Sequence, residues 1–118
     1  MKGISYAING FKTAFKTEVN IKTHFAATLV VVLFGWFFEI SAIEWILIAG
    51  CVGLVISMEM MNTAVEYLVD FVSPEIHVKA GKIKDISAGA VLTVALTALI
   101  VGLIIFIPKI TVWLQGFA

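Results

Sequence analysis

Four polar side chains that could take part in acid–base chemistry or metal binding recur on one apolar segment. Glu59, Asn62, Glu66 and Asp70 are spaced three, four and four residues apart. At about 100° per residue, these spacings place all four on one narrow stripe of a helix. A carboxylate inside lipid hydrocarbon costs roughly 2.5–3.5 kcal/mol even on the most lenient insertion scale. The acids and the amide of this stripe therefore need partners, a bound metal or a proton.

Such a stripe is compatible with three kinds of function: a polar seam that joins helices in an oligomer, a path for protons or cations, and a catalytic site. The segment that follows, residues 75–89, favours a catalytic site because it supplies further reactive groups. Lys82 and Lys84 are cations, and Asp85 is another carboxylate near the start of the next apolar segment. The free N–H groups at a helix start also attract anions.

Carboxylates and lysines together suit a magnesium-bound nucleotide, because carboxylates hold the metal and ammonium groups neutralise the phosphates. The carboxylates that can meet these lysines at one membrane surface are Glu18, Glu66, Asp70 and Asp85. Glu59 lies deeper along the stripe and is the natural general base for a hydroxyl presented by a lipid. Lys84 and Asp85 are equally compatible with an ordinary solvated ion pair.

The sequence lacks the glycine-rich loops of common soluble kinases. It contains no GxxxxGK[ST] segment, no protein-kinase glycine loop and no HRD motif. Its eight basic residues are all lysines, so phosphate must be held by point charges or backbone donors. His24 and His77 are isolated, without the spacing of metal ligands, and we expect both at the membrane interface. His77 is also placed to face a phosphate.

The composition is that of a membrane protein. Hydrophobic residues make up 61% of the 118 positions and charged residues 14%, whereas soluble domains average about 45–50% and about 25%. A chain this small cannot hide so much apolar surface in its own core, so lipid must cover it. The net charge is zero, which gives no electrostatic case for binding nucleic acid.

Apolar runs and breakers predict a single all-α integral membrane domain over residues 1–118. Three membrane spans are expected at about 21–40, 42–71 and 86–108, the last ending at Pro108. Pro74 and Gly81 are expected to break the chain between the second and third spans. Ahead of the spans, Ile4, Ile8, Phe11 and Phe15 line one face of an amphipathic surface helix over about 3–18.

The distribution of lysines predicts the orientation of the spans. Seven lysines lie before the first span or between the second and third, and Lys109 alone lies after the third. The N-terminus is therefore expected in the cytoplasm. Small residues four apart, Ala49 with Gly53 and Ala98 with Gly102, let helices approach closely in lipid, and we expect an oligomer.

Several motifs together resemble the prokaryotic diacylglycerol kinase family. They are E-x-x-N-x-x-x-E-x-x-x-D over residues 59–70, then P-E-x-H over 74–77 and K-D-x-x-A-G-A-V-L over 84–92. The segments HFAA, ISAIEW and GLIIFIPKI extend the resemblance over nearly the whole chain. It is closest to the Gram-positive branch, whose members phosphorylate undecaprenol.

The resemblance implies a homotrimer with sites between subunits, Mg²⁺ and ATP, and a lipid alcohol as acceptor. It implies that Glu59 is the catalytic base and that Asn62 is its neighbour in the substrate site. Glu18 and Glu66 match the glutamates that bind the metal. The remaining nucleotide contacts that it implies are Tyr6, Glu75, His77, Lys84 and Asp85. Asp70, Lys12 and Lys82 are expected to support the site.

Two positions bear on the identity of the acceptor. The Gram-negative branch carries a basic residue ahead of the aromatic that corresponds to Tyr6, and here Lys2 is its only counterpart. Ala88, a substrate-site position, stands where that branch has a serine that contacts diacylglycerol. We therefore expect undecaprenol as the acceptor, with diacylglycerol as the alternative, in a bacterial plasma membrane.

Overall fold

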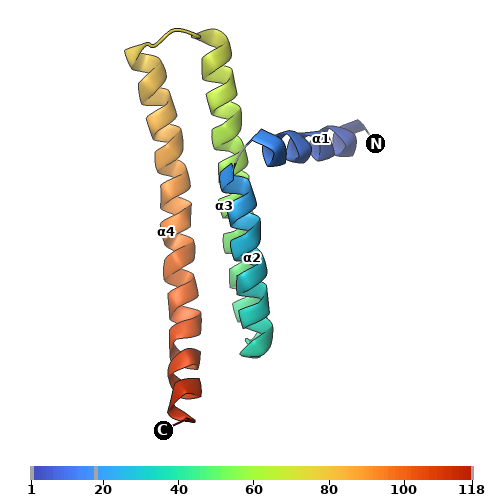
Figure 1. The fold of residues 1–118 in the computed structure, drawn as a ribbon, viewed down its shortest axis with the longest axis vertical. Helices are drawn as coiled ribbons and strands as arrows, with labels where there is room; N and C mark the ends of the chain where they lie inside the picture. The colour runs from blue at the N-terminus through green and yellow to red at the C-terminus, as the bar shows by residue number, and fades with distance from the viewer. Residues whose placement is uncertain (1, 18, 118) are drawn as a thin grey trace.

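The computed structural model describes residues 2–17 and 19–117, and this part of the chain consists of four helices and short connections. The helices are α1 (Lys2–Thr17), α2 (Val19–Phe37), α3 (Ala42–Val72) and α4 (Val78–Gln115). Figure 1 shows α3 and α4 as a long hairpin, with α2 running beside the lower half of α3. The expectation of an all-helical protein is confirmed.

Three of the helices are long and apolar enough to cross a membrane: α2 from Asn20, α3 and α4. At about 1.5 Å per residue, α2 measures about 28 Å, close to the roughly 30 Å of bilayer hydrocarbon. By the same rise α3 measures about 46 Å and α4 about 57 Å. The hairpin of α3 and α4 is therefore much longer than α2 and projects beyond its beginning (Figure 1).

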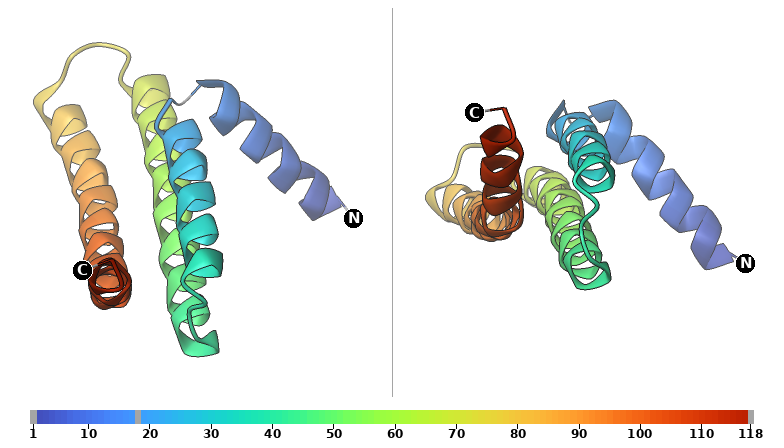
Figure 2. Two further views of the ribbon diagram at one scale, coloured as in Figure 1. Left: turned by 60° about the horizontal axis from the view of Figure 1, so that its bottom comes forward. Right: turned by 90° about the horizontal axis from the view of Figure 1, so that it is seen from below.

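Helix α1 leaves the bundle where α2 begins, about halfway along α3, and both views of Figure 2 show it pointing away from the other helices. The rings of Phe15 and Phe25, 5.3 Å apart, attach it to α2. Ile4, Ile8 and Phe11, which with Phe15 form the predicted apolar face, are 46–56% exposed in the single chain. A helix at these positions is confirmed, and its place at the membrane surface stays a prediction.

The best-packed part of the molecule lies at the end of the bundle away from α1. Ile40, Ile48, Ile105 and Phe106 are buried there and form one cluster. Aromatic rings extend it, because Phe38 packs against both Phe106 and Trp113, with ring centroids 6.4 and 6.3 Å apart. Most other apolar side chains are exposed in the single chain, as lipid-facing or subunit-facing surfaces require.

A tight turn joins α2 to α3. Glu39 has φ 51°, and the N–H of Ile40 donates to the carbonyl of Gly35 at 3.1 Å, which is the hydrogen-bond pattern of a Schellman cap. Gly35 must lack a side chain, since a Cβ there would lie 2.7 Å from the ring of Trp45. Ser41 and Glu44 then form a capping box that begins α3.

Two expectations about helix ends are wrong. Pro108 lies inside α4, which continues to Gln115. Proline removes one backbone hydrogen bond, but the segment beyond it is held by packing of Trp113 and by the Lys109 Nζ–Glu44 Oε2 ion pair at 2.7 Å. Gly81 lies in α4 as well, because His77 caps that helix: its Nδ1 accepts the N–H of Lys79 at 3.1 Å. Only residues 73–77 connect α3 to α4.

The positive φ of Glu39 predicts a stabilising substitution. Glycine avoids the clash between Cβ and carbonyl that left-handed backbone imposes on other residues, so Glu39→Gly should raise the free energy of unfolding by about 1 kcal/mol. Unfolding of the detergent-solubilised protein measures the change. Glu39→Ala is the matched control, since it removes the same charge and keeps the Cβ. Equal stabilisation by both variants would show that the charge, and not the backbone, is responsible.

Candidate active site

The structure pairs Glu59 of α3 with His24 of α2. Nε2 of His24 lies 2.9 Å from Oε1 of Glu59. The Glu59 side chain is 7% exposed and that of His24 26% exposed. An ionised carboxylate only accepts hydrogen bonds, so with Glu59 ionised the imidazole donates from Nε2.

The neighbourhood of Glu59 is a small buried polar cluster. Thr63, one turn further along α3, is buried, and its hydroxyl donates to the carbonyl of Glu59 at 3.1 Å. Oδ1 of Asn62 is buried and has no hydrogen-bond partner in the described part of the chain. A buried acceptor without a partner is costly. This amide is therefore a candidate for binding a ligand or a second subunit.

Exposure increases along the predicted stripe towards the α3–α4 connection. Glu59 is buried, Asn62 and Glu66 are half-buried, and Asp70 is exposed. Near the connection, Nζ of Lys84 donates to Oδ1 of Asp70 at 2.6 Å. One helix thus carries a desolvated carboxylate at one end of the stripe and a solvated, lysine-paired carboxylate at the other.

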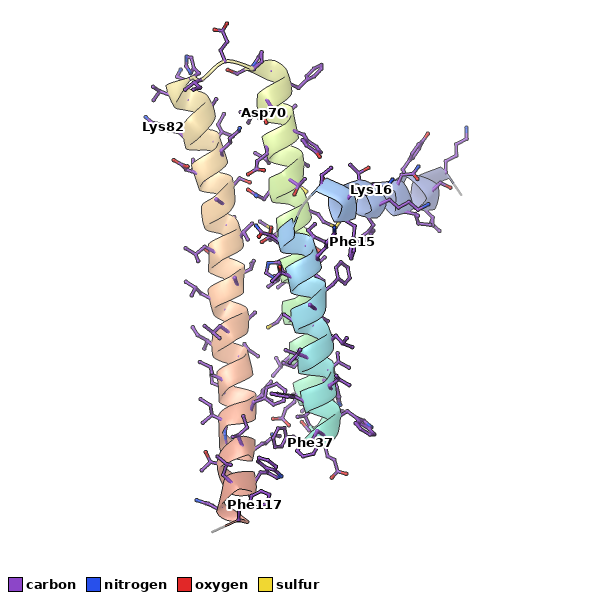
Figure 3. The ribbon with its side chains drawn as sticks, in the orientation of Figure 1. Phe15, Lys16, Phe37, Asp70, Lys82 and Phe117 are labelled. Carbon is purple, nitrogen blue, oxygen red and sulfur yellow. The ribbon has the colours of Figure 1, made fainter. Side chains whose placement is uncertain are left out.

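The other predicted site residues are spread over the chain. Glu75, His77, Lys82, Asp85 and Ala88 are exposed around the beginning of α4. Tyr6 and Lys12 are exposed on α1. Figure 3 shows Asp70 and Lys82 towards the end of the hairpin, whereas Phe15 and Lys16 of α1 lie well below it. Within one chain the structure pairs Lys84 with Asp70, and it does not bring the α1 residues to them.

Sequence reasoning missed His24 as a partner of Glu59. The histidine was expected at the interface and isolated. One signal could have found it: His24 lies 14 residues before the turn at residues 38–41 and Glu59 18 residues after it (38 − 24 and 59 − 41), a difference of about one helical turn. In an antiparallel helix pair with a tight turn, such residues lie at similar depth, so a polar side chain on each is a candidate contact.

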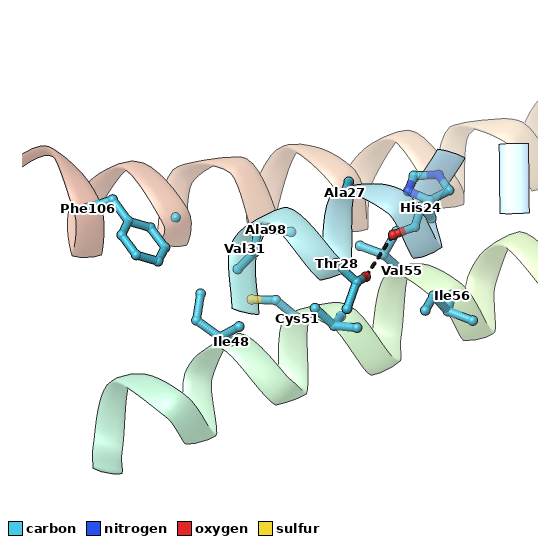
Figure 4. A pocket seen from close by; sticks show the side chains of 12 residues that line it. His24, Ala27, Thr28, Val31, Ile48, Cys51, Val55, Ile56, Ala98 and Phe106 are labelled. Atoms are coloured by element: carbon cyan, nitrogen blue, oxygen red, sulfur yellow. Dashed lines mark hydrogen bonds between the residues drawn. The ribbon is translucent and has the colours of Figure 1, made fainter. Parts of the chain in front are cut away.

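A cavity of about 170 Å³ lies between α2, α3 and α4, with His24 at one end and Phe106 at the other (Figure 4). Its other lining residues are mostly apolar, and the hydroxyl of Thr28 is already bonded to the carbonyl of His24 at 2.7 Å. Ala98 and Gly102, expected to allow close helix contact, are among the residues that line this cavity. The imidazole of His24 is therefore the principal polar group that lines an otherwise apolar cavity.

The metal site expected from the sequence is only partly within the described structure. Glu66 is half-buried on α3, and Glu18 lies outside the described residues. Among those described, no three His, Cys, Asp or Glu side chains gather into a metal-binding group. Magnesium bound to a nucleotide needs only one or two carboxylates beside phosphate oxygens and water, so the lack of such a group among the described residues is compatible with a Mg²⁺ site that includes Glu66.

Comparison with known proteins decides the family. Residues 5–106 match the family described as prokaryotic diacylglycerol kinase. The chain belongs to this family. As a member of the prokaryotic diacylglycerol kinase family, it is a lipid kinase. The buried His24–Glu59 pair and the exposed Asp70–Lys84 pair are therefore features of such an enzyme.

Relatives in this family include two differently named activities. The chain is 38% identical to an undecaprenol kinase of Bacillus subtilis, over 92% of this chain and 89% of that protein. It is 30% identical to a diacylglycerol kinase of Escherichia coli K12, over 85% of this chain and 82% of that protein. A diacylglycerol kinase of Synechocystis is 34% identical, over 89% of this chain and 61% of that protein.

The Asp70–Lys84 pair should contribute little to stability. The side chains are 62% and 38% exposed, and exposed pairs are typically worth about 0.2–1 kcal/mol. We expect a double-mutant cycle of Asp70→Asn and Lys84→Met to give a coupling energy in that range, decreasing with added salt. Unfolding in detergent at low and high salt measures it. A coupling energy well above this range would mean that the pair holds the hairpin together.

Proposed function

We propose that the chain transfers the γ-phosphate of ATP to the hydroxyl of undecaprenol, forming undecaprenyl phosphate at the cytoplasmic face of a bacterial plasma membrane. The observation that carries the proposal is the gradient along α3, from buried Glu59 to exposed, lysine-paired Asp70. In a lipid kinase, the lipid hydroxyl arrives from the membrane, on the side of buried Glu59, and the water-soluble nucleotide arrives from the solvent, on the side of exposed Asp70. The higher identity and coverage of the undecaprenol kinase of Bacillus subtilis favour this acceptor.

The length of α2 supports a location for Glu59 just inside the cytoplasmic boundary of the hydrocarbon. If α2 crosses the bilayer, its beginning marks that boundary, and His24 lies about 7 Å inside it. Glu59 contacts His24 and so has the same depth. Glu66 and Asp70 then lie about 10 and 16 Å further towards the cytoplasm. This is a shallower position than the bilayer centre, and a lipid hydroxyl anchored near the headgroups can reach it.

Glu59 is the proposed general base. It accepts the proton of the lipid hydroxyl while the oxygen forms a bond to the γ-phosphorus, and the bond from that phosphorus to the ADP oxygen breaks. Asn62 is the proposed substrate contact, because its buried Oδ1 has no partner among the described residues. Ala88, exposed on α4, is the third proposed contact of the acceptor.

The exposed charges near the end of the hairpin are proposed to bind the nucleotide. Lys84 lies 2.6 Å from Asp70, and it can exchange this carboxylate for a phosphate oxygen without leaving the surface. The other proposed nucleotide contacts are Tyr6, Glu75, His77 and Asp85, supported by Lys12 and Lys82. Glu18 and Glu66 would hold Mg²⁺, whose charge offsets that of the phosphates.

We further propose that the site is completed in a homotrimer. The α1 residues that the family resemblance assigns to the nucleotide lie away from the end of the α3–α4 hairpin within one chain (Figure 3). Large apolar surfaces of α3 and α4 are exposed in the single chain, and a neighbouring subunit can cover part of them. Helix α1 then lies in the cytoplasmic interface, its apolar face in lipid, and the N-terminus is cytoplasmic, as the lysine distribution predicts.

Replacement of the base tests the chemical step. Glu59→Gln keeps the size of the side chain and a hydrogen-bonding oxygen but cannot accept the proton. We expect kcat to fall by about 100- to 10,000-fold with little change in KM for ATP. Labelled ATP and undecaprenol in detergent or lipid vesicles measure both constants. Glu39→Gln, at the turn between α2 and α3, is the control. Full activity of Glu59→Gln would remove Glu59 from the proposed role.

The identity of the acceptor is tested by competition. Purified protein receives undecaprenol and diacylglycerol at equal mole fraction in the same vesicles, with labelled ATP. We expect undecaprenyl phosphate as the principal product, because the chain resembles an undecaprenol kinase over most of its length. Predominant formation of phosphatidic acid would contradict the proposed acceptor and leave the lipid kinase assignment intact.

A further inference from the structure

We infer that His24 is a positioning residue that holds the Glu59 carboxylate in the orientation needed to accept the hydroxyl proton. The inference rests on the proposed function, because it concerns the base of the same reaction. Nε2 of His24 and Oε1 of Glu59 are 2.9 Å apart. The two residues belong to different helices, so this contact ties the position of the base to the packing of α2 on α3.

Burial makes the contact necessary. The Glu59 side chain is 7% exposed, and a buried carboxylate without a hydrogen-bond donor loses its hydration with no compensation. The N–H of His24 compensates one of its two oxygens. Oε2 is left to meet the hydroxyl, and rotation of the carboxyl group about its terminal bond is restricted while Oε1 is held.

Histidine suits this position better than a permanent cation. A lysine or arginine at position 24 would pair more strongly with the carboxylate and stabilise it against accepting a proton. An imidazole that donates from Nε2 orients the carboxylate without placing a permanent charge beside it. The same ring lines the apolar cavity between α2, α3 and α4.

Three substitutions at position 24 separate orientation from other roles. Glutamine can place an amide N–H near the position of Nε2, asparagine is too short to reach, and leucine has no donor. We expect His24→Leu and His24→Asn to lower kcat roughly 10- to 100-fold with unchanged KM for ATP. His24→Gln should retain activity within a few-fold of the natural protein.

A double mutant tests whether His24 acts through Glu59. If it does, adding His24→Leu to Glu59→Gln should cause no further loss, because the carboxylate that the imidazole orients is already gone. Thr97→Val is the control for loss of a polar group in a membrane helix; its hydroxyl donates to the Thr93 carbonyl at 2.9 Å, and we expect unchanged activity. Thermal unfolding of each variant identifies any that fail to fold.

Each result decides the inference. Full activity of both His24→Leu and His24→Asn would overturn it, as would a raised KM for ATP at unchanged kcat. Loss of activity in His24→Gln equal to that in His24→Leu would also overturn it, because a donor at this place would then not be sufficient. If His24→Leu does not fold, the comparison of His24→Gln with His24→Asn decides. Failure of the natural protein to phosphorylate either lipid would refute the proposed function instead.

Discussion

The turn at residues 38–41 reverses the chain within a few residues, and the alignment of α2 along α3 follows from it. The left-handed Glu39, the close approach of Gly35 to Trp45 and the Ser41–Glu44 capping box fix the geometry of this reversal. Because α2 ends at this turn and is about 28 Å long, its N-terminal turns lie beside α3 near Glu59. The contact of His24 with Glu59 is therefore a consequence of a turn at the opposite end of the helix pair.

The same alignment creates the difference between the two ends of the polar stripe. The upper part of α3 extends beyond the beginning of α2 (Figure 1), and the side chains of the polar stripe become progressively exposed in that direction. Glu59 is enclosed by α2, and Asp70 is solvated and paired with Lys84. One helix can thus present a desolvated carboxylate to a lipid and charged groups to a nucleotide. A longer α2 would enclose the upper part of the stripe and remove this distinction.

The described part of the chain buries few of its apolar side chains. Its small buried core lies at the end of the bundle away from α1, held by the Phe38, Phe106 and Trp113 rings and by the Glu44–Lys109 ion pair. A cavity between the three long helices extends from Phe106 to His24. The packed cluster at one end of the bundle can hold the helices in place. The cavity and the polar residues towards the other end leave room for a ligand.

The sequence alone determined the class of protein, the three apolar helices and the stripe from Glu59 to Asp70, because composition and helical periodicity are local properties. Its motifs also indicated the family. Only the tertiary structure decided that α4 continues through Pro108, since packing of Trp113 and the Lys109 ion pair compensate for an interruption that local rules treat as a stop. It also showed that α4 includes Gly81, because His77 caps the helix ahead of it. It alone joined His24 to Glu59. The His24–Glu59 contact depends on how α2 and α3 are aligned and rotated relative to each other. The periodicity of either helix alone does not determine this alignment.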